Sequence, residues 1–377
     1  MAKNDNLTDF LTDIASEIRA QTGNYKGIDP QDFSQYFALI DSLEEKDVNF
    51  YDIDGKCIYA YTWEEFESMQ ELPEIPIKNR GGISISNFKW NYTLDEIKAQ
   101  KVHHCDVGVV YSNEKYCYFI VNIPSNNYTV SFSGTIHSGS TSSGIDWGDG
   151  TVNKSKSHVF NAGTYCIKVD GYCEASKYIS GGILPKNIVS EAYIGILAGG
   201  QCDATRRLSI NKTGNSNYVD SISYNSFCPC LICGSDMQDT NDLFYGSLAD
   251  KIILNPTKKS LTGLIAVKNI KTLCIPEGVT YISGLSNCLN LKKIYCPSTI
   301  TEINTMGSNC RNLKVVDFSV STQVPAITNS YAFQNTLNCS IIVPDNLYDE
   351  WITSYSWPHI ISLHNIKIIK ASEYTEQ

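Results

Sequence analysis

Near its carboxyl end the chain contains Leu273-Cys274-Ile275-Pro276-Glu277-Gly278-Val279-Thr280, and the same pattern returns as Ile294-Tyr295-Cys296-Pro297-Ser298-Thr299-Ile300-Thr301. A second segment repeats as well, because Asn287-Cys288-Leu289-Asn290-Leu291-Lys292 recurs as Asn309-Cys310-Arg311-Asn312-Leu313-Lys314. A period in the low twenties with Leu, Ile and Cys at fixed positions is typical of a leucine-rich solenoid, in which each coil buries its apolar positions against the next. The sequence therefore predicts such a solenoid over residues 251–369, followed by a short tail over 370–377.

The first 46 residues carry two apolar stripes at helical spacing, the first ending at Gly23 and the second starting near Pro30. Two small helices cannot bury both of their faces alone, so residues 1–46 are expected to be a helical attachment or oligomerisation module. Packing of these helices on the following domain only is an equal alternative. The side chains assigned to attachment are Leu7, Leu11, Ile14, Ile18, Phe33 and Phe37.

Residues 47–123 alternate strand and helix signals. Val48 to Gly55, followed by Cys57 to Tyr61, predicts a hairpin around an Asp-Gly turn. Two helix starts are marked by capping boxes, in which a hydroxyl and a carboxylate satisfy free backbone amides: Thr62 with Glu65, and Thr93 with Glu96. We therefore expect a small α/β module over this range.

Residues 124–175 predict a small antiparallel sandwich, because polar and apolar residues alternate between glycine-rich turns. Within it, Asp146-Trp147-Gly148-Asp149-Gly150-Thr151 predicts a tight hairpin with Trp147 packed inward. Residues 176–250 are rich in Ser, Asn and Gly with scattered apolar runs, and are expected to be a strand-rich intermediate region. The predicted fold class is thus a multi-domain, β-rich α+β protein.

Composition limits the possible partners. A chain of 377 residues with 42% hydrophobic and 19% charged residues is too long for one ordinary core and too apolar to be wholly disordered. A net charge of −10 and a pI near 5.1 argue against nucleic acid as a partner, because affinity for phosphate comes from clustered Lys and Arg.

The beginning of the sequence lacks a basic run followed by the apolar core of a secretory signal, and no stretch approaches the length of a membrane span. We therefore expect no membrane insertion, and synthesis and folding in the host cytoplasm. In that compartment the 14 cysteines are expected to be reduced and mostly buried. Cys288 and Cys310 occupy equivalent positions in successive coils, and are predicted to be packing residues.

Four groups of residues have the composition of a chemical site, and each has a simpler interpretation. Cys228-Pro229-Cys230 with Cys233 has metal-like spacing but lacks a second pair and a nearby His, so buried thiols are preferred. The acidic pairs lack the residue that ends an EF-hand loop and are expected to form turns: Asp52 with Asp54, and Asp146 with Asp149. His103 and His104 are adjacent and would face apart on a strand.

We accordingly predict no catalytic, cofactor-binding or metal-binding residue. No phosphate loop and no nucleophile elbow is found in the sequence. The paired carboxylates of a glycosidase remain an open alternative, because such pairs assemble in space and not along the chain.

Several segments resemble known families. Residues 273–318 resemble the BspA-like leucine-rich repeats in their Ile-Pro step, Val/Ile-Thr step and Asn-Cys-x-x-Leu-Lys turn, and residues 341–357, with Trp351 and Trp357, look like the cap that often closes such arrays. Residues 130–170 resemble a PKD-like sandwich through the Asp-Trp-Gly-Asp-Gly-Thr hairpin. Residues 7–40 resemble an N-terminal module of phage tail and other virion proteins, and residues 48–111 resemble a module that accompanies it in prophage-encoded proteins.

The order of these modules resembles that of phage structural proteins. The resemblance implies a non-enzymatic, homotrimeric virion protein, a fibre, spike or decoration, without a cofactor. Residues 1–46 would contact other virion proteins, and the carboxyl-terminal repeats would bind a host-surface or gut glycan or protein. The resemblance fixes no ligand-binding residue. Two alternatives stay open: a bacterial BspA-like surface adhesin, and a phage fibre that cleaves the polysaccharide it binds.

Overall fold

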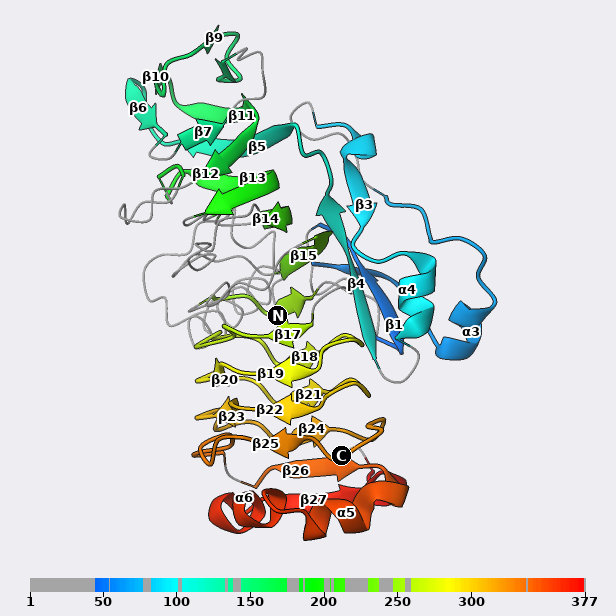
Figure 1. Cartoon of the computed structure of the whole chain (residues 1–377). Coiled ribbons are helices and arrows are strands. Elements are labelled where there is room, and N and C mark those ends of the chain that lie inside the picture. Colours follow the sequence, from blue (N-terminus) through cyan, green and yellow to red (C-terminus); the bar gives the residue numbers. More distant parts are fainter. Residues whose placement is uncertain are drawn as a thin grey trace, which may run out of the picture.

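The structure, a computed structural model, is built mainly from strands. It describes residues 45–53, 55–76, 83–100, 104–132, 135–137, 144–174, 183–185, 187–199, 204, 207–213, 230–236, 247–254, 259–336 and 338–375. Within these ranges the strands form several sheets and the helices are few and short (Figure 1). The β-rich class expected from the sequence is therefore confirmed.

The carboxyl-terminal part is a stack of short coils whose strands pair in parallel (Figure 1). In the longest ladder Leu273 pairs with Ile294, and Ile294 pairs with Val316, so the strand pairing follows the sequence repeat. This ladder consists of β18 (Thr272–Cys274), β21 (Lys293–Tyr295), β24 (Val315–Asp317), β26 (Ser340–Val343) and β27 (Lys367–Lys370). Two shorter parallel ladders accompany it: β17 (Ser260–Leu261), β19 (Tyr281–Ile282), β22 (Glu302–Ile303) and β25 (Ala326–Ile327), and then β20 (Leu285–Ser286) with β23 (Met306–Ser308).

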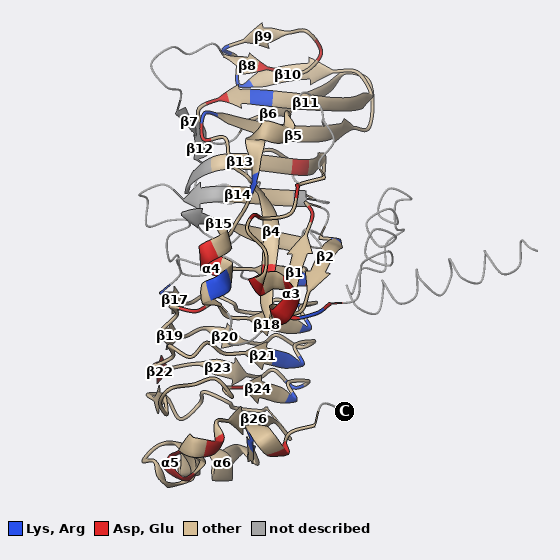
Figure 2. Cartoon of the chain, turned by 90° about the vertical axis from the view of Figure 1, so that its right-hand side faces the viewer, with Lys and Arg blue, Asp and Glu red and all other residues tan. Residues whose placement is uncertain are grey.

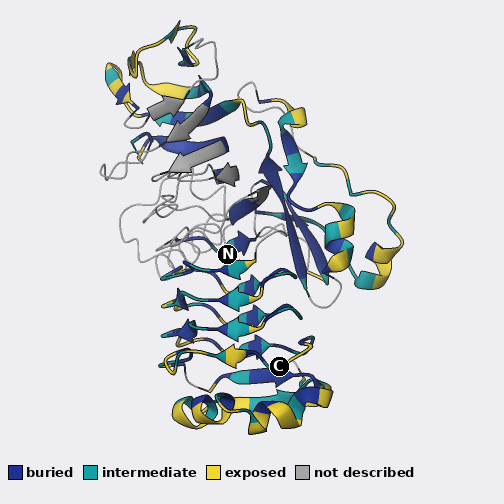
Figure 3. Ribbon diagram, in the orientation of Figure 1, coloured by how far each residue is buried: buried dark blue, intermediate teal, exposed yellow. Residues whose placement is uncertain are grey.

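The interior of the coil stack is apolar. Leu273, Ile294 and Val316 are fully buried, and so are the repeated cysteines Cys288 and Cys310, as the sequence predicts. The strands of the stack are coloured mostly as buried or intermediate in Figure 3. A single coil would leave its apolar side chains open to water on both sides, so burial against neighbouring coils supplies the stability.

The repeated asparagine lies in a turn with left-handed backbone. Asn287 and Asn309 both have φ of 58°, a conformation that Asn adopts more readily than most residues. Asn335 takes the same conformation in the next coil, and its Nδ2 donates a hydrogen bond to Asn309 Oδ1 at 2.7 Å. Backbone geometry therefore explains why the repeat has Asn at this position.

Two helices cover the end of the stack, α5 (Tyr348–Thr353) and α6 (Trp357–His364), between the 3-10 turns η2 (Asp345–Leu347) and η3 (Ala371–Glu373). Trp351 and Trp357 are fully buried with ring centres 4.4 Å apart, and the ring of Phe318 lies 5.1 Å from that of Trp351. The indole N–H of Trp357 donates to the Pro325 carbonyl at 2.8 Å, so its polar edge is satisfied. These aromatic side chains shield the last coil from water.

A ten-stranded sheet continues from the other end of the stack. Its order is β16-β15-β14-β13-β5-β11-β8-β9, with β12 paired to β13 and β7 paired to β12. Strands β13 to β16 pair in parallel, whereas β5, β11, β8 and β9 pair in antiparallel fashion. The strands are β5 (Tyr116–Ile123), β7 (Thr135–His137), β8 (Ile145–Asp146), β9 (Val152–Asn153), β11 (Gly163–Asp170), β12 (Tyr172–Glu174), β13 (Val189–Gly199), β14 (Arg207–Thr213), β15 (Cys230–Asp236) and β16 (Lys251–Ile253).

This sheet crosses the boundaries that the sequence suggests at residues 123, 175 and 250. Strand β5 ends the expected 47–123 module, yet it pairs with β11 on one side and with β13 on the other. Strand β16, from the expected repeat region, pairs with β15. The suggested boundaries therefore do not coincide with sheet boundaries, because local patterns locate a strand without identifying its partner.

The hairpin predicted around Trp147 is confirmed. The Trp147 amide donates to the Thr151 carbonyl at 3.0 Å, and the Trp147 side chain is fully buried. Gly148 and Gly150 have φ of 81° and 92°, values that suit glycine. A separate two-stranded antiparallel sheet is formed by β6 (Tyr128–Ser131), which precedes the hairpin along the chain, and β10 (Ser157–Phe160), which follows it. Phe132 directly follows β6, and the centre of its ring lies 5.7 Å from that of Trp147.

A four-stranded sheet of order β2-β1-β4-β3 is formed by β1 (Val48–Tyr51), β2 (Cys57–Tyr61), β3 (Phe88–Trp90) and β4 (Cys105–Tyr111). The predicted hairpin is the antiparallel β1–β2 pair. Both capping boxes are also confirmed, at the starts of α3 (Trp63–Glu67) and α4 (Leu94–Ala99). A 3-10 turn, η1 (Ile85–Asn87), leads into β3. Strand β1 pairs in parallel with the first half of β4. The last three residues of β4 pair in antiparallel fashion with β3.

Two leucines of one coil test the stacking. Leu291 is fully buried between coils, whereas Leu289, two positions earlier, is 52% exposed. Leu291→Ala should lower the free energy of unfolding by about 2–5 kcal/mol because a cavity opens in the core, and Leu289→Ala should change it by no more than about 0.5 kcal/mol. Urea titrations followed by fluorescence measure both values, and equal losses would show that the coils do not stack as described.

Candidate functional site

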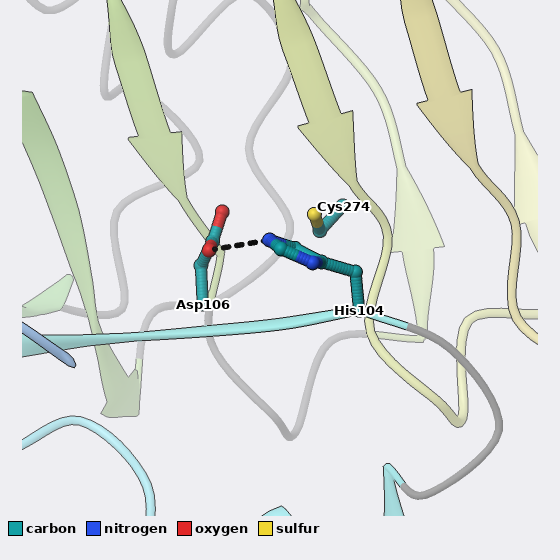
Figure 4. Close-up of side chains that lie close together, drawn as sticks. All are labelled: His104, Asp106 and Cys274. Carbon is teal, nitrogen blue, oxygen red and sulfur yellow. Dashed lines mark ion pairs between the residues drawn. The ribbon is translucent and has the colours of Figure 1, made fainter. Parts of the chain in front are cut away.

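Five polar side chains meet where the four-stranded sheet lies against the coil stack: Glu45, His104, Asp106, Lys251 and Cys274. We call this group the junction cluster. Asp106 belongs to β4, Lys251 to β16 and Cys274 to β18, so the fold gathers residues that are far apart along the chain. Figure 4 shows the His104 ring directed at Asp106, with the Cys274 sulfur beside it.

Asp106 is the centre of the junction cluster. Its Oδ2 lies 3.0 Å from the Lys251 ammonium, and its Oδ1 lies 3.3 Å from His104 Nε2. Lys251 also reaches Glu45 Oε1 at 3.1 Å, and its nitrogen lies 4.6 Å from the centre of the Tyr51 ring. A charge taken out of water is tolerated only when it is paired, and here the one ammonium is paired with two carboxylates.

These contacts set the protonation of the cluster. Burial alone would raise the pKa of Asp106, but Lys251 and His104 outweigh burial and hold that pKa well below its usual value. Burial alone would lower the pKa of Lys251, but Asp106 and then Glu45 raise it. The thiol of Cys274 differs, because burial and then Asp106 raise its pKa well above the ordinary value. At neutral pH the pair is therefore ionised and Cys274 is a neutral thiol.

Asn49 of β1 lies beside the histidine and Asp106. Its amide is fixed by the Lys46 backbone, since Oδ1 accepts from Lys46 N at 2.7 Å and Nδ2 donates to Lys46 O at 3.0 Å. The same Nδ2 lies 2.9 Å from His104 Nε2 and 3.5 Å from Asp106 Oδ1. The Asn49 amide group and the Asp106 carboxylate therefore both face Nε2 of His104.

Further contacts tie the four-stranded sheet to the coils at this point. The His104 ring stacks on Tyr295 of β21, with ring centres 5.4 Å apart and planes 12° from parallel. The Glu277 amide donates to Gln100 Oε1 at 2.6 Å. The junction cluster is thus part of the interface between two parts of the fold.

A small cavity borders the junction cluster. Its volume is about 10 Å³, and His104, Asp106, Cys274 and Tyr92 are among the residues that line it. This is about the volume that one bound water or ion requires. A sugar ring or a peptide is much larger, so this cavity is not a substrate site for ligands of that size.

The residues assigned to attachment from the sequence lie outside the described residues, and so does Cys228. Cys230 and Cys233 are both buried in β15, where a spacing of three places them on opposite faces of the strand. Cys230 packs in a cluster with Tyr51 and Val110, and Cys233 belongs to the main core. Those two thiols therefore occupy the buried positions that the sequence favours.

The acidic pairs behave as turns where they are described. Asp146 Oδ1 accepts from the Gly148 amide at 3.0 Å, and Asp149 Oδ1 accepts from the Thr151 amide at 2.9 Å. Asp52 Oδ1 accepts from the Lys56 amide at 3.0 Å. Asp54 and His103 lie outside the described residues.

The junction cluster could not be predicted from the sequence. His104 attracts notice only as one of two adjacent histidines, and it lies far from Cys274 along the chain. The sequence carries one signal, because each of two otherwise apolar strands contains a charged residue: Asp106 within β4 and Lys251 at the start of β16. A buried charge needs a partner, but the sequence does not say which one.

The coil stack also presents a column of lysines to solvent. Lys271, Lys292 and Lys314 are exposed at equivalent positions in successive coils. The Lys292 amide donates to the Lys271 carbonyl and the Lys314 amide to the Lys292 carbonyl, each at 2.8 Å. Figure 2 shows basic residues gathered beside β18, β21 and β24. The column is a local basic surface on a chain whose net charge is −10.

Comparisons with known proteins identify no relative: no family model, no curated protein and no solved structure matches the chain. In the described part of the chain, no helix combines the length and the apolar character that a membrane crossing requires. Function is therefore inferred from the residues, their geometry and the resemblances of individual segments.

Asp106→Asn should lower the free energy of unfolding by about 3–5 kcal/mol at pH 7, because the Lys251 ammonium loses its main counter-charge inside the protein. The folded pKa of Asp106 is depressed, so its contribution is complete above the unfolded pKa of about 4 and is lost as the pH falls through the folded pKa. The effect of the substitution should accordingly be smaller at pH 3 than at pH 7.

Urea titrations at the two pH values measure this difference. Glu65→Gln is the matched control, because it removes an exposed ion pair with Lys46 and keeps a hydrogen-bonding side chain in the capping box. Its effect should be small at both pH values. An equally small effect of Asp106→Asn would contradict the assignment of a buried ion pair.

Proposed function

We propose that the chain is a non-enzymatic structural and binding protein of a bacteriophage particle, of the fibre, spike or decoration kind. In this proposal residues 251–369 are BspA-like leucine-rich repeats with a cap, residues 124–175 are a PKD-like sandwich, and residues 1–46 attach the protein to other virion proteins. The protein folds in the host cytoplasm, assembles as a homotrimer and resides on the virion. The order of the resemblances along the chain supports this location.

The stack of parallel coils is the observation that carries the binding role. One apolar core extends from Cys117 in the ten-stranded sheet to Ile366 beside the cap, so the coils are continuous with the sheet above them. Stacked coils provide an extended surface that stays rigid because each coil is held by its neighbours. Such a surface loses little conformational freedom on binding, which favours contact with a large ligand such as a host-surface or gut glycan or protein.

The surface of the coils has features of a contact face. Tyr331 beside the last coil and Tyr355 between α5 and α6 of the cap are exposed large side chains, and tyrosine combines an apolar ring with a polar hydroxyl. The column formed by Lys271, Lys292 and Lys314 favours a ligand that carries negative charge. Both features support recognition of a ligand by the outer surface of the stack.

The junction cluster gives no support to an enzymatic role. Its charged groups are paired with one another, and the adjoining cavity of about 10 Å³ has no room for a sugar. A fibre that cleaves polysaccharide remains the enzymatic alternative, and incubation of the full chain with host capsule separates the two roles. Binding without release of reducing ends is expected, whereas release of reducing ends would refute the non-enzymatic proposal.

Removal of the N-terminal segment tests the attachment role. The structure shows that this deletion should stop at residue 44, because Glu45 contacts Lys251 and Lys46 fixes Asn49. The fragment 45–377 should remain soluble and folded but should be absent from purified particles, whereas the full chain should be detected in them by mass spectrometry.

Circular dichroism and thermal melting of the fragment provide the folding control. A folded fragment that still enters particles would show that attachment lies elsewhere in the chain. Absence of the full chain from intact particles would refute the virion assignment itself.

A further inference from the structure

The junction cluster contains three potential metal ligands of different chemistry. His104 directly precedes β4, Asp106 lies in β4 and Cys274 lies in β18, and their ligand atoms are all within 4.8 Å of one another. The cavity of about 10 Å³ beside them is lined by all three residues and has the volume of one small atom. We propose that His104, Asp106 and Cys274 bind a single divalent metal ion, for which zinc is the best match.

The ligand types select the metal. Imidazole nitrogen, carboxylate oxygen and thiolate sulfur are the three groups by which proteins hold zinc, whereas calcium and magnesium take oxygen ligands. Three protein ligands leave one position of a tetrahedral ion for a water molecule. The cavity itself has room for the ion alone.

The charge of the junction cluster also suits a divalent ion. The carboxylates of Asp106 and Glu45 exceed the single ammonium of Lys251 by one negative charge. Coordination replaces the Cys274 S–H bond with a sulfur–metal bond and releases the proton to solvent, which adds a second negative charge. The two positive charges of the ion then neutralise the cluster.

Lys251 does not occupy the same place as the ion. Its ammonium contacts Asp106 through Oδ2, whereas Oδ1 is the oxygen that faces His104 Nε2. Oδ1 is therefore the atom positioned to share an ion with the histidine. The ammonium on the other side of the carboxylate fixes its orientation.

Asn49 acts as a positioning residue. One N–H of its Nδ2 bonds to the Lys46 carbonyl, and the other lies between His104 Nε2 at 2.9 Å and Asp106 Oδ1 at 3.5 Å. When the ion takes the Nε2 lone pair, this N–H serves the Asp106 oxygen alone. The ion would then connect the four-stranded sheet, through His104 and Asp106, with the coil stack, through Cys274.

Zinc binding by the full chain tests the proposal. The protein is stripped with a chelator under reducing conditions, equilibrated with zinc chloride and passed through a desalting column before elemental analysis. The unsubstituted chain should retain one more zinc per chain than Cys274→Ser or His104→Gln. Cobalt in place of zinc should give a thiolate-to-metal absorption band that Cys274→Ser lacks.

Cys296→Ser is the matched control, because Cys296 is a fully buried cysteine in the next coil and lies outside the cluster. It should retain the zinc, and zinc should raise the melting temperature of this variant and of the unsubstituted chain by the same amount. Asn49→Ala should weaken zinc binding by roughly 10–100-fold, the range for the loss of an outer hydrogen-bond partner.

Two ligand variants are used because one of them could fail to fold. His104→Gln removes a ligand that lies outside the coil strands, so these strands should stay intact. If Cys274→Ser is too unstable to measure, the zinc content of His104→Gln tests the proposal alone. Equal zinc content in the unsubstituted chain and in a folded His104→Gln or Cys274→Ser variant would overturn the proposal, even if other cysteines bind zinc elsewhere.

Discussion

Parallel pairing of each coil with the next is the constraint on which the rest of the structure depends. A strand as short as β18 or β21 has too few hydrogen bonds and too little buried area to persist alone. Stacking pairs β21 with β18 on one side and with β24 on the other, and it covers Leu273 and Ile294 at the same time. The same parallel geometry extends into β13 to β16, so the large sheet and the coils share one core.

The four-stranded sheet is attached to the ten-stranded sheet and the coil stack through apolar packing and also through polar groups. Asn91 donates to the Cys233 and Leu254 carbonyls and accepts from the Gly108 amide, and the Asp106–Lys251 pair links β4 to β16. Polar contacts of this kind are directional, and they cost much stability if one partner is lost. They therefore define one relative position of the two parts, whereas apolar packing alone would tolerate several.

Local features of the fold could be predicted from the sequence, and long-range ones could not. The capping boxes at Thr62 and Thr93 and the Trp147 hairpin depend on residues within a few positions of one another, so their patterns are sufficient. The pairing of β5 with both β11 and β13, and the meeting of His104 with Cys274, depend on which strands become neighbours. Alternation of apolar residues carries no information about that choice.

The aromatic cap determines how such an array can change its length. Trp351 and Trp357 seal the final coil against Phe318, so an extra coil added after the cap would find no open apolar face on which to dock. Growth by internal duplication between the sheet and the cap would instead preserve both ends. Variants of this chain with a longer reach should therefore differ by whole coils in the middle of the stack, each as long as the step from Leu273 to Ile294, with the terminal tryptophans unchanged.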